Sequence, residues 1–212
     1  MPRKKLQRFT EIKNLDNVWE FDQENLKQRL EKTLENYQGL NLELACGKGE
    51  YTLALAEKNP RELFVGIDLQ GERLWSGATT ALKNNLNNVL FLRVEIEKLL
   101  DFIPEKSVKQ IWLTFPDPQA KKGRAKKRLT APRFLEIYQK ILKAQANVHL
   151  KTDDQNLFLF SQASIKNFGA KILESEKYQA EEGSDNPLLA IKTTYEKKQI
   201  AGQTIYYLKF NL

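Results

Sequence analysis

The chain has 212 residues and a single cysteine, so one α/β domain is the natural count and an internal disulfide is excluded. Hydrophobic residues make up 41% of it, enough for a core, yet no run approaches the roughly 20 apolar residues of a transmembrane helix. Because the basic N-terminus also lacks the apolar run of a signal peptide, a reducing, cytoplasmic compartment is expected.

The net charge of +7 comes from 34 Lys and Arg against 27 Asp and Glu, and its excess lies in two acid-free segments. An N-terminal arm supplies four cations and a later block supplies six: Arg3, Lys4, Lys5 and Arg8, then Lys121, Lys122, Arg124, Lys126, Lys127 and Arg128. Without these ten, 24 cations stand against 27 acids. The block predicts a docking site for a polyanion, whereas the arm fits a solvated tail equally well.

Taken in chain order, an amphipathic helix is expected over residues 21–37, outside any sheet. Short apolar runs then alternate with helical patterns, which predicts strands over 40–45, 63–67, 89–94, 110–115 and 147–151, and helices over 50–58, 71–84, 130–142 and 154–168. Two extended patterns, 171–178 and 204–210, predict a closing antiparallel pair. The fold class is therefore α/β, a doubly wound, mostly parallel sheet with an antiparallel C-terminal edge, and a ligand is expected at the carboxyl ends of the strands.

A glycine-rich turn follows the first predicted strand in the sequence LELACGKGE, residues 42–50. Gly47 and Gly49 would let a ligand come close to the backbone. The turn lacks the full glycine set of a dinucleotide fingerprint, and Glu50 at the helix start would oppose a pyrophosphate. A cationic cofactor without phosphate fits better, which favours S-adenosylmethionine.

Acidic residues follow the successive strands: Glu43, Asp68, Glu95 and Asp117. Asp68 lies 19 residues after Gly49, the usual place for an acid that holds ribose hydroxyls. Glu95 is placed to accept from an adenine amino group, although alone it is better explained as a solvated acid. Asp117 lies between two prolines, which fix it on a stiff corner at the end of a strand. Together the four acids predict a methyltransferase of Rossmann-like fold.

Several motifs carry a family resemblance over nearly the whole chain: LELACGKGEY, VGIDL, LTFPDPQAKKGRAKKRLTAPRFL, LKTDD and TTYEKK. With them the chain resembles bacterial tRNA (guanine-N7-)-methyltransferases, which modify a guanosine in the variable loop of tRNA. The resemblance implies residues 39–212 as the methyltransferase domain, behind a basic arm and accessory helix in residues 1–38. It also implies tRNA as partner. The residues themselves predict no metal and no membrane, and monomer or homodimer is left open.

The resemblance implies three groups of site residues. The cofactor is held by Glu43, Gly47, Gly49, Asp68, Glu95 and Asp117, of which Asp117 is also the catalytic residue. The substrate is bound by Lys121, Asp153, Thr193, Thr194, Tyr195 and Glu196. RNA is contacted by Gly123, Arg124, Ala125, Lys126, Lys127 and Arg128.

This sequence departs from the family pattern at several positions. Ala45 stands where glycine is usual, so the turn must avoid a positive φ or accept strain. Gln119-Ala120 replaces Trp-Pro, and Gly123-Arg124 replaces Arg-His, which keeps a cation but removes any role for a histidine there. Glu95 replaces an aspartate with a longer acid.

The expected chemistry needs no general base, because guanine N7 carries a lone pair and no proton. It needs in-line placement of N7, methyl carbon and sulfur. Positive charge moves onto the guanine, and Asp117, Asp153 or Glu196 is placed to stabilise it or to hold the N1–H and amino groups. Which of the three faces the ring is left open.

Other candidate sites are weaker. One cysteine and one histidine do not make a zinc site, and Cys46 and His149 are interpreted as packing residues. Two other functions remain as alternatives. The FPDP turn loosely resembles that of exocyclic-amine methyltransferases, but the aromatic residue after the second proline is missing. A non-enzymatic RNA-binding module is opposed by the four intact acids.

Overall fold

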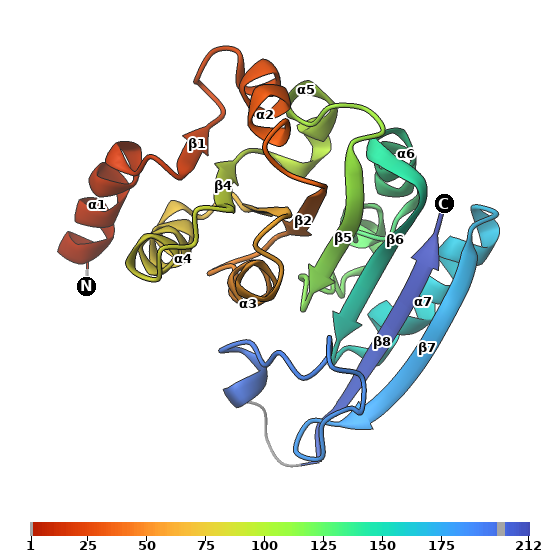
Figure 1. Cartoon of the computed structure of the whole chain (residues 1–212). Coiled ribbons are helices and arrows are strands. Elements are labelled where there is room, and N and C mark those ends of the chain that lie inside the picture. The colour runs from red at the N-terminus through yellow and green to blue at the C-terminus, as the bar shows by residue number, and fades with distance from the viewer. Residues whose placement is uncertain (1, 199–201) are drawn as a thin grey trace.

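The computed structural model describes residues 2–198 and 202–212, and this part forms an eight-stranded sheet of order β1-β4-β3-β2-β5-β6-β8-β7 (Figure 1). The strands are β1 (Val18–Glu20), β2 (Leu40–Leu44), β3 (Leu63–Ile67), β4 (Val89–Arg93), β5 (Val108–Thr114), β6 (Leu142–Thr152), β7 (Lys171–Gln179) and β8 (Thr204–Asn211). The pairs among β1 to β6 are parallel, whereas β8 is antiparallel to β6 and β7. The predicted doubly wound sheet with an antiparallel C-terminal edge is confirmed.

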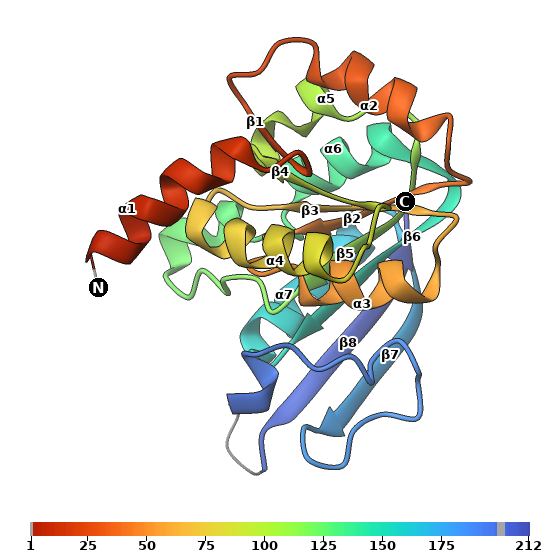
Figure 2. The same ribbon diagram turned by 60° about the vertical axis from the view of Figure 1, so that its left-hand side comes forward.

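Helices cover both faces of the sheet (Figure 2). They are α1 (Pro2–Glu11), α2 (Leu26–Leu34), α3 (Glu50–Lys58), α4 (Gly71–Lys83), α5 (Leu99–Phe102), α6 (Pro132–Ile141) and α7 (Gln155–Asn167), with short 3₁₀ turns η1 (Ile12–Asn14), η2 (Ile96–Lys98), η3 (Lys122–Lys127) and η4 (Glu196–Lys198). Within the described ranges, none of these helices has the length and apolar character needed to cross a membrane.

Alternating side chains of the strands divide the core into two clusters. Val65 belongs to a cluster with the apolar faces of α2, α5, α6 and α7. Its neighbour Phe64 belongs to a second cluster, with η1, α3 and α4. Because α3 and α4 begin directly after β2 and β3, their first turns meet at the carboxyl edge of the sheet.

Close packing brings α4 and the glycine turn against β4. The ring of Phe91 fills the space beside Gly49 and Gly77. A Cβ at Gly49 would lie 2.5 Å from that ring, and one at Gly77 would lie 2.4 Å from the carbonyl oxygen of Lys48. Glycine at these two positions therefore sets how close the turn lies to α4.

The first 38 residues contribute more than the accessory helix that was expected. Strand β1 pairs with β4 and buries Trp19, and helix α1 lies beside α4. Arg8 of α1 forms an ion pair of 3.0 Å with Glu72 and lies 4.6 Å from the centre of the Trp75 ring. The side chains of Arg3, Lys4 and Lys5 lie outside the described part. Division of the chain at residue 39 remains a proposal.

One further difference concerns β6, which begins at Leu142, directly after α6, rather than near residue 147. Residues 143–145 are polar or small and exposed, so they lack the apolar pattern of a buried strand. The pairing of β5 with β6 shifts register between Val108 and Gln110, and Gln145 has a φ of +62°. The irregular start explains why the strand was predicted too short.

Candidate functional site

Two adjoining pockets open at the carboxyl edge of the sheet. The inner pocket, of about 300 Å³, is lined by Ala45, Cys46, Gly47, Lys48, Glu50, Arg73, Thr114, Phe115, Thr193, Thr194, Tyr195 and Lys198. The outer pocket, of about 620 Å³, is lined by Gln70, Arg73, Phe115, Pro116, Asp117, Pro118, Asp153, Asp154, Tyr195 and Gln203. Arg73, Phe115 and Tyr195 line both, so they form the boundary between the two pockets.

The glycine turn forms one wall of the inner pocket and adopts a strained backbone. Ala45, Gly47 and Gly49 have φ values of +55°, +57° and +66°. Alanine in this region costs roughly 1–2 kcal/mol. The turn therefore accepts strain at Ala45 rather than avoiding the left-handed conformation.

Asp68 connects this turn to the start of α4. One carboxylate oxygen accepts from the backbone N–H of Gly47 at 2.9 Å, and the other accepts from the N–H of Gln70 at 2.9 Å. A carboxylate has about four acceptor sites, so both oxygens retain capacity for a ligand hydroxyl. Asp68 thus shapes the turn, and although among the described residues it lines neither main pocket, its bond to Gly47 places it next to the lining of the inner pocket.

Glu43 lies beneath the turn and is only 3% exposed. Its Oε2 accepts from the backbone N–H and the hydroxyl of Thr52 at 2.8 and 2.7 Å, and its Oε1 accepts from the Thr114 hydroxyl at 2.7 Å. Burial raises the pKa of Glu43 to about 7, against the lowering effect of these hydrogen bonds. Glu43 is absent from the lining of both pockets in the described part of the chain. It reaches the inner pocket through its hydrogen bond with Thr114, which does line that pocket.

Glu95 lies apart from the two pockets, at a smaller side pocket of about 190 Å³. Phe21, Leu69, Lys98 and Phe102 complete its lining, and Glu95 is 3.4 Å from the Lys98 ammonium. Phe21 is 59% exposed and Leu69 54% exposed, which is unusual for large apolar side chains and offers a face for a flat ring.

Asp117 is exposed in the outer pocket, on the corner that the two prolines predict. Its Oδ1 accepts from the N–H of Gln119 at 2.9 Å, and Phe115 and Gln119 on either side have φ values of +47° and +48°. Backbone strain of this kind is concentrated at functional sites. Asp153 faces the same pocket and accepts from the Tyr195 hydroxyl at 3.0 Å.

Within the sequence-predicted segment Thr193–Glu196, the residues 193–195 form the opposite wall of the inner pocket. Thr194 donates to Glu50 from its backbone N–H at 2.9 Å and also from its hydroxyl. The ring of Tyr195 lies 5.3 Å from that of Phe115, centre to centre. Glu196 behaves differently: it is 4% exposed, and its Oε2 is 2.9 Å from the Lys151 ammonium.

The basic block forms η3 beside the outer pocket, where five of its six cations are exposed: Lys121, Lys122, Arg124, Lys126 and Lys127. Arg128 folds back instead. Its Nε donates to the carbonyl of Pro118 at 3.0 Å, and its guanidinium lies 4.5 Å from the centre of the Phe160 ring. Arg128 therefore supports the Asp117 corner, and the other five cations are the ones available to a polyanion.

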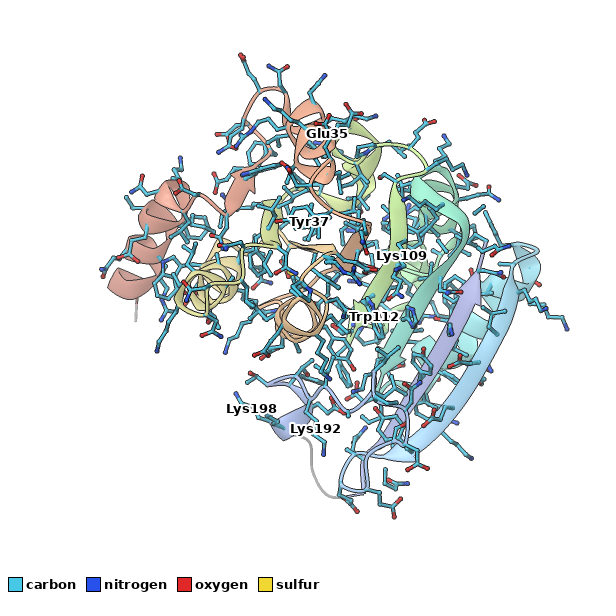
Figure 3. The ribbon with its side chains drawn as sticks, in the orientation of Figure 1. Glu35, Tyr37, Lys109, Trp112, Lys192 and Lys198 are labelled. Atoms are coloured by element: carbon cyan, nitrogen blue, oxygen red, sulfur yellow. The ribbon has the colours of Figure 1, made fainter. Side chains whose placement is uncertain are left out.

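Sequence reasoning missed Arg73, which lines both pockets from the first turn of α4. No hydrogen bond or ion pair engages its side chain within residues 2–198 and 202–212. Its position one turn beyond Asp68 was the available signal. Lys48 and Lys198 add two more cations to the inner pocket, the latter from the segment that joins β7 to β8 (Figure 3).

His149 and Cys46 are buried, as expected of packing residues. The His149 ring stacks on Trp112 at 3.9 Å, and its Nδ1 is 2.8 Å from the Tyr207 hydroxyl (Trp112 is labelled in Figure 3). Burial lowers the pKa of His149 to about 3, so the ring is neutral at physiological pH.

Three comparisons with known proteins accompany this geometry. A family model described as "Putative methyltransferase" matches residues 38–208. A tRNA (guanine-N(7)-)-methyltransferase of Christiangramia forsetii is 38% identical over 220 residues, 99% of this chain and 98% of that protein. Among solved structures, an antibiotic-related methyltransferase matches with a TM-score of 0.68 at 17% identity, over 87% of this chain and 92% of that one. A 16S rRNA (adenine(1408)-N(1))-methyltransferase with cosubstrate SAM from Catenulisporales acidiphilia matches with 0.66 at 13%, over 87% and 90%. At these identities the structural likeness shows the fold alone.

Proposed function

Because the chain belongs to the tRNA (guanine-N7-)-methyltransferase family, we propose that it transfers a methyl group from S-adenosylmethionine to N7 of a guanosine in the variable loop of tRNA. The observation that carries the proposal is the pair of adjoining pockets. They share the Phe115–Tyr195 boundary, where a methyl group can pass between a cofactor and a base. The known family role supports the choice of the variable loop, and for an enzyme acting on tRNA we propose a cytoplasmic location.

The inner pocket suits the amino-acid end of S-adenosylmethionine. That end carries a carboxylate and an ammonium, and the pocket presents the cations Lys48, Arg73 and Lys198 beside the acid Glu50. Asp68 at the glycine turn suits the ribose hydroxyls. The side pocket combines the apolar faces of Phe21 and Leu69 with the Glu95 carboxylate, a match for an adenine ring and its amino group. The cofactor supplies a methyl group on a positively charged sulfur.

The outer pocket suits the guanine. Tyr195 and Phe115 offer aromatic faces to a base that has left its stack, and Asp117 and Asp153 offer carboxylates to its N1–H and amino group. Held by that edge, the base turns its N7 away from the carboxylates, towards the boundary with the inner pocket. The same carboxylates stabilise the positive charge that develops on the ring, so orientation and electrostatics replace a general base.

The five exposed cations of the basic block support docking of the tRNA backbone next to the outer pocket. Contacts between these cations and phosphates do not distinguish one base from another, so selection of the guanosine falls to the outer pocket. Docking and base recognition are thus assigned to separate groups of residues.

The decisive experiment incubates the purified protein with methyl-labelled S-adenosylmethionine and a tRNA transcript, followed by nuclease digestion and mass analysis of the nucleosides. The expected product is N7-methylguanosine, absent when the variable-loop guanosine is replaced by adenosine. Label on an exocyclic amine would support the alternative methyltransferase class. Tight tRNA binding without any transfer would support the non-enzymatic RNA-binding module.

A further inference from the structure

Lys151 of β6 is completely buried, and its ammonium has four partners. It donates to the Tyr51 hydroxyl at 3.0 Å, to the carbonyls of Leu189 and Ile191 at 3.0 and 3.2 Å, and to Glu196 Oε2 at 2.9 Å. Burial lowers the pKa of Lys151, and the Glu196 carboxylate opposes that effect. A charge so far from water persists only because this set of acceptors surrounds it.

Glu196 points into the protein and away from both pockets. Its side chain is 1% exposed, and it lines neither pocket among the described residues. Its second oxygen, Oε1, is buried without a hydrogen-bond partner in that part of the chain. The family resemblance implies substrate binding for Glu196, yet a carboxylate in this position has no surface to offer to tRNA.

Three of the four Lys151 partners lie on the long connection between β7 and β8, which reaches back from the sheet edge towards α3, and the fourth, Tyr51, belongs to α3 itself (Figures 1 and 2). The hydrogen bonds from Lys151 to Leu189, Ile191 and Glu196 hold this connection against β6. The Thr194–Glu50 contact fastens it to the first turn of α3, directly after the glycine turn. Thr193 and Tyr195 lie between these fixed points, and together with Thr194 they form one wall of the inner pocket.

We propose that Lys151 and Glu196 act as a pair of positioning residues, which hold residues 193–195 at the boundary of the two pockets without touching tRNA or cofactor. The expected effect of this pair on catalysis rests on the proposed function. The geometry of the segment is independent of that function.

The consequence follows from the precision that methyl transfer needs. A displacement of about 1 Å at a reacting centre costs on the order of 10²-fold in rate. Tyr195 contacts both Phe115 and Asp153, so a loosened segment moves an aromatic face and breaks the Tyr195–Asp153 hydrogen bond at once. Loss of the buried pair should therefore lower kcat far more than it raises KM for tRNA.

The test compares Glu196→Gln, Lys151→Met and the double variant with wild type, after circular dichroism has established which of them fold. Hydrogen exchange of residues 189–196 is measured first, on free protein without cofactor or tRNA. Positioning predicts at least about 10-fold faster exchange there in Glu196→Gln, because local opening becomes easier. Lys192→Met is the matched control, since Lys192 lies on the same segment but, within the described residues, its ammonium donates to the Ala180 carbonyl rather than to Glu196. Loss of this like charge does not weaken the Lys151–Glu196 pair, so exchange should be no faster than in wild type and activity should be unchanged.

The same proteins are then compared in methyl transfer. Because the two residues act as one unit, the double variant should lie within about threefold of the worse single variant. If Lys151→Met does not fold, Glu196→Gln alone decides the question, through its hydrogen-exchange rate and through whether its loss of activity lies in kcat or in KM for tRNA. Unchanged exchange in Glu196→Gln together with a rise confined to KM for tRNA would overturn the proposal in favour of direct contact. If wild type forms no N7-methylguanosine, the proposed function fails while the exchange result still stands on its own.

Discussion

The two walls of the inner pocket are held in place by different kinds of contact. The glycine turn is fixed by bonds between near neighbours, such as the 2.8 Å bond from the Gly49 N–H to the Cys46 carbonyl, and by Asp68 at the end of the adjacent strand. The wall made by residues 193–195 depends on Lys151, 45 residues from Glu196, and on Glu50, 144 residues from Thr194. The first wall includes Asp68, which is assigned to the ribose, so changes there should affect the cofactor. The second wall carries Tyr195 at the boundary with the outer pocket, so changes there should affect the chemistry.

Asp117 lies beyond both walls, and its loss has the largest expected effect. Asp117→Ala should lower kcat by at least about 100-fold, the scale for removing a key electrostatic group. The melting temperature should change little, because the side chain is exposed. Asp117→Asn separates charge from shape, since its amide oxygen can still accept from the Gln119 N–H. Near-normal turnover in either folded variant would remove the Asp117 charge from the mechanism.

Glu43 lies beneath the glycine turn, and it should make the stability of the protein depend on pH. Its pKa is raised from 4.5 to about 7, so the folded protein retains a proton that the unfolded chain releases. This contribution to stability is complete below pH 4.5 and is lost as pH rises through 7, up to about 3 kcal/mol in total. In Glu43→Gln, urea unfolding between pH 5 and pH 8 should show a flatter pH dependence than wild type. Identical slopes in wild type and Glu43→Gln would contradict the raised pKa of Glu43.

Asp68 tests whether the first wall serves the cofactor alone. Asp68→Ala should weaken S-adenosylmethionine binding by about 1–3 kcal/mol, because ribose hydroxyls lose a charged acceptor. Affinity for tRNA without cofactor should be nearly unchanged. Glu72→Ala, on the adjacent first turn of α4, removes an acid that pairs with Arg8 rather than with the glycine turn, so this variant should bind cofactor normally. Calorimetry decides, and equal cofactor affinity in wild type and Asp68→Ala would argue against the ribose role.

Changes in the basic block should alter the binding of tRNA and leave both walls of the inner pocket unchanged. Replacing Arg124, Lys126 and Lys127 with alanine should flatten the salt dependence of tRNA binding by about three contacts, each worth roughly −0.9 in slope. Arg128 is left intact because it supports the Asp117 corner. The matched control replaces Lys140, Lys143 and Lys171, three exposed cations near the opposite edge of the sheet. An equal change of slope in both triple variants would reduce the block to a general charge effect.

The same contrast explains what the sequence could predict. Apolar runs such as 63–67 mark buried strands directly, and α3 was predicted at its observed bounds. Strand β1 was missed because three residues are too short for a pattern, and α1 because its cations hide its packing face. Gly47, Asp68 and Asp117 follow strands in local motifs, so their place at the carboxyl edge of the sheet could be predicted. Their roles in binding and catalysis stay predictions.

The partners of Lys151 could not be named, because the Leu189 and Ile191 carbonyls lie 38 and 40 residues away and belong to backbone. The inward turn of Glu196 follows from that contact. Arg73 was missed for a related reason. Its position shortly after Asp68 is visible in the sequence, but only the assembled sheet shows that its side chain lines both pockets.

The most direct test of the central claim is a structure of the protein bound to S-adenosylhomocysteine and tRNA. We expect the amino-acid end of the cofactor product in the inner pocket and the variable-loop guanine in the outer pocket, with its N7 facing the sulfur across the Phe115–Tyr195 boundary. Residues 193–195 should keep their present contacts with Glu50 and Asp153. A guanine that approaches the sulfur through its amino group, or a base bound outside the outer pocket, would contradict the account.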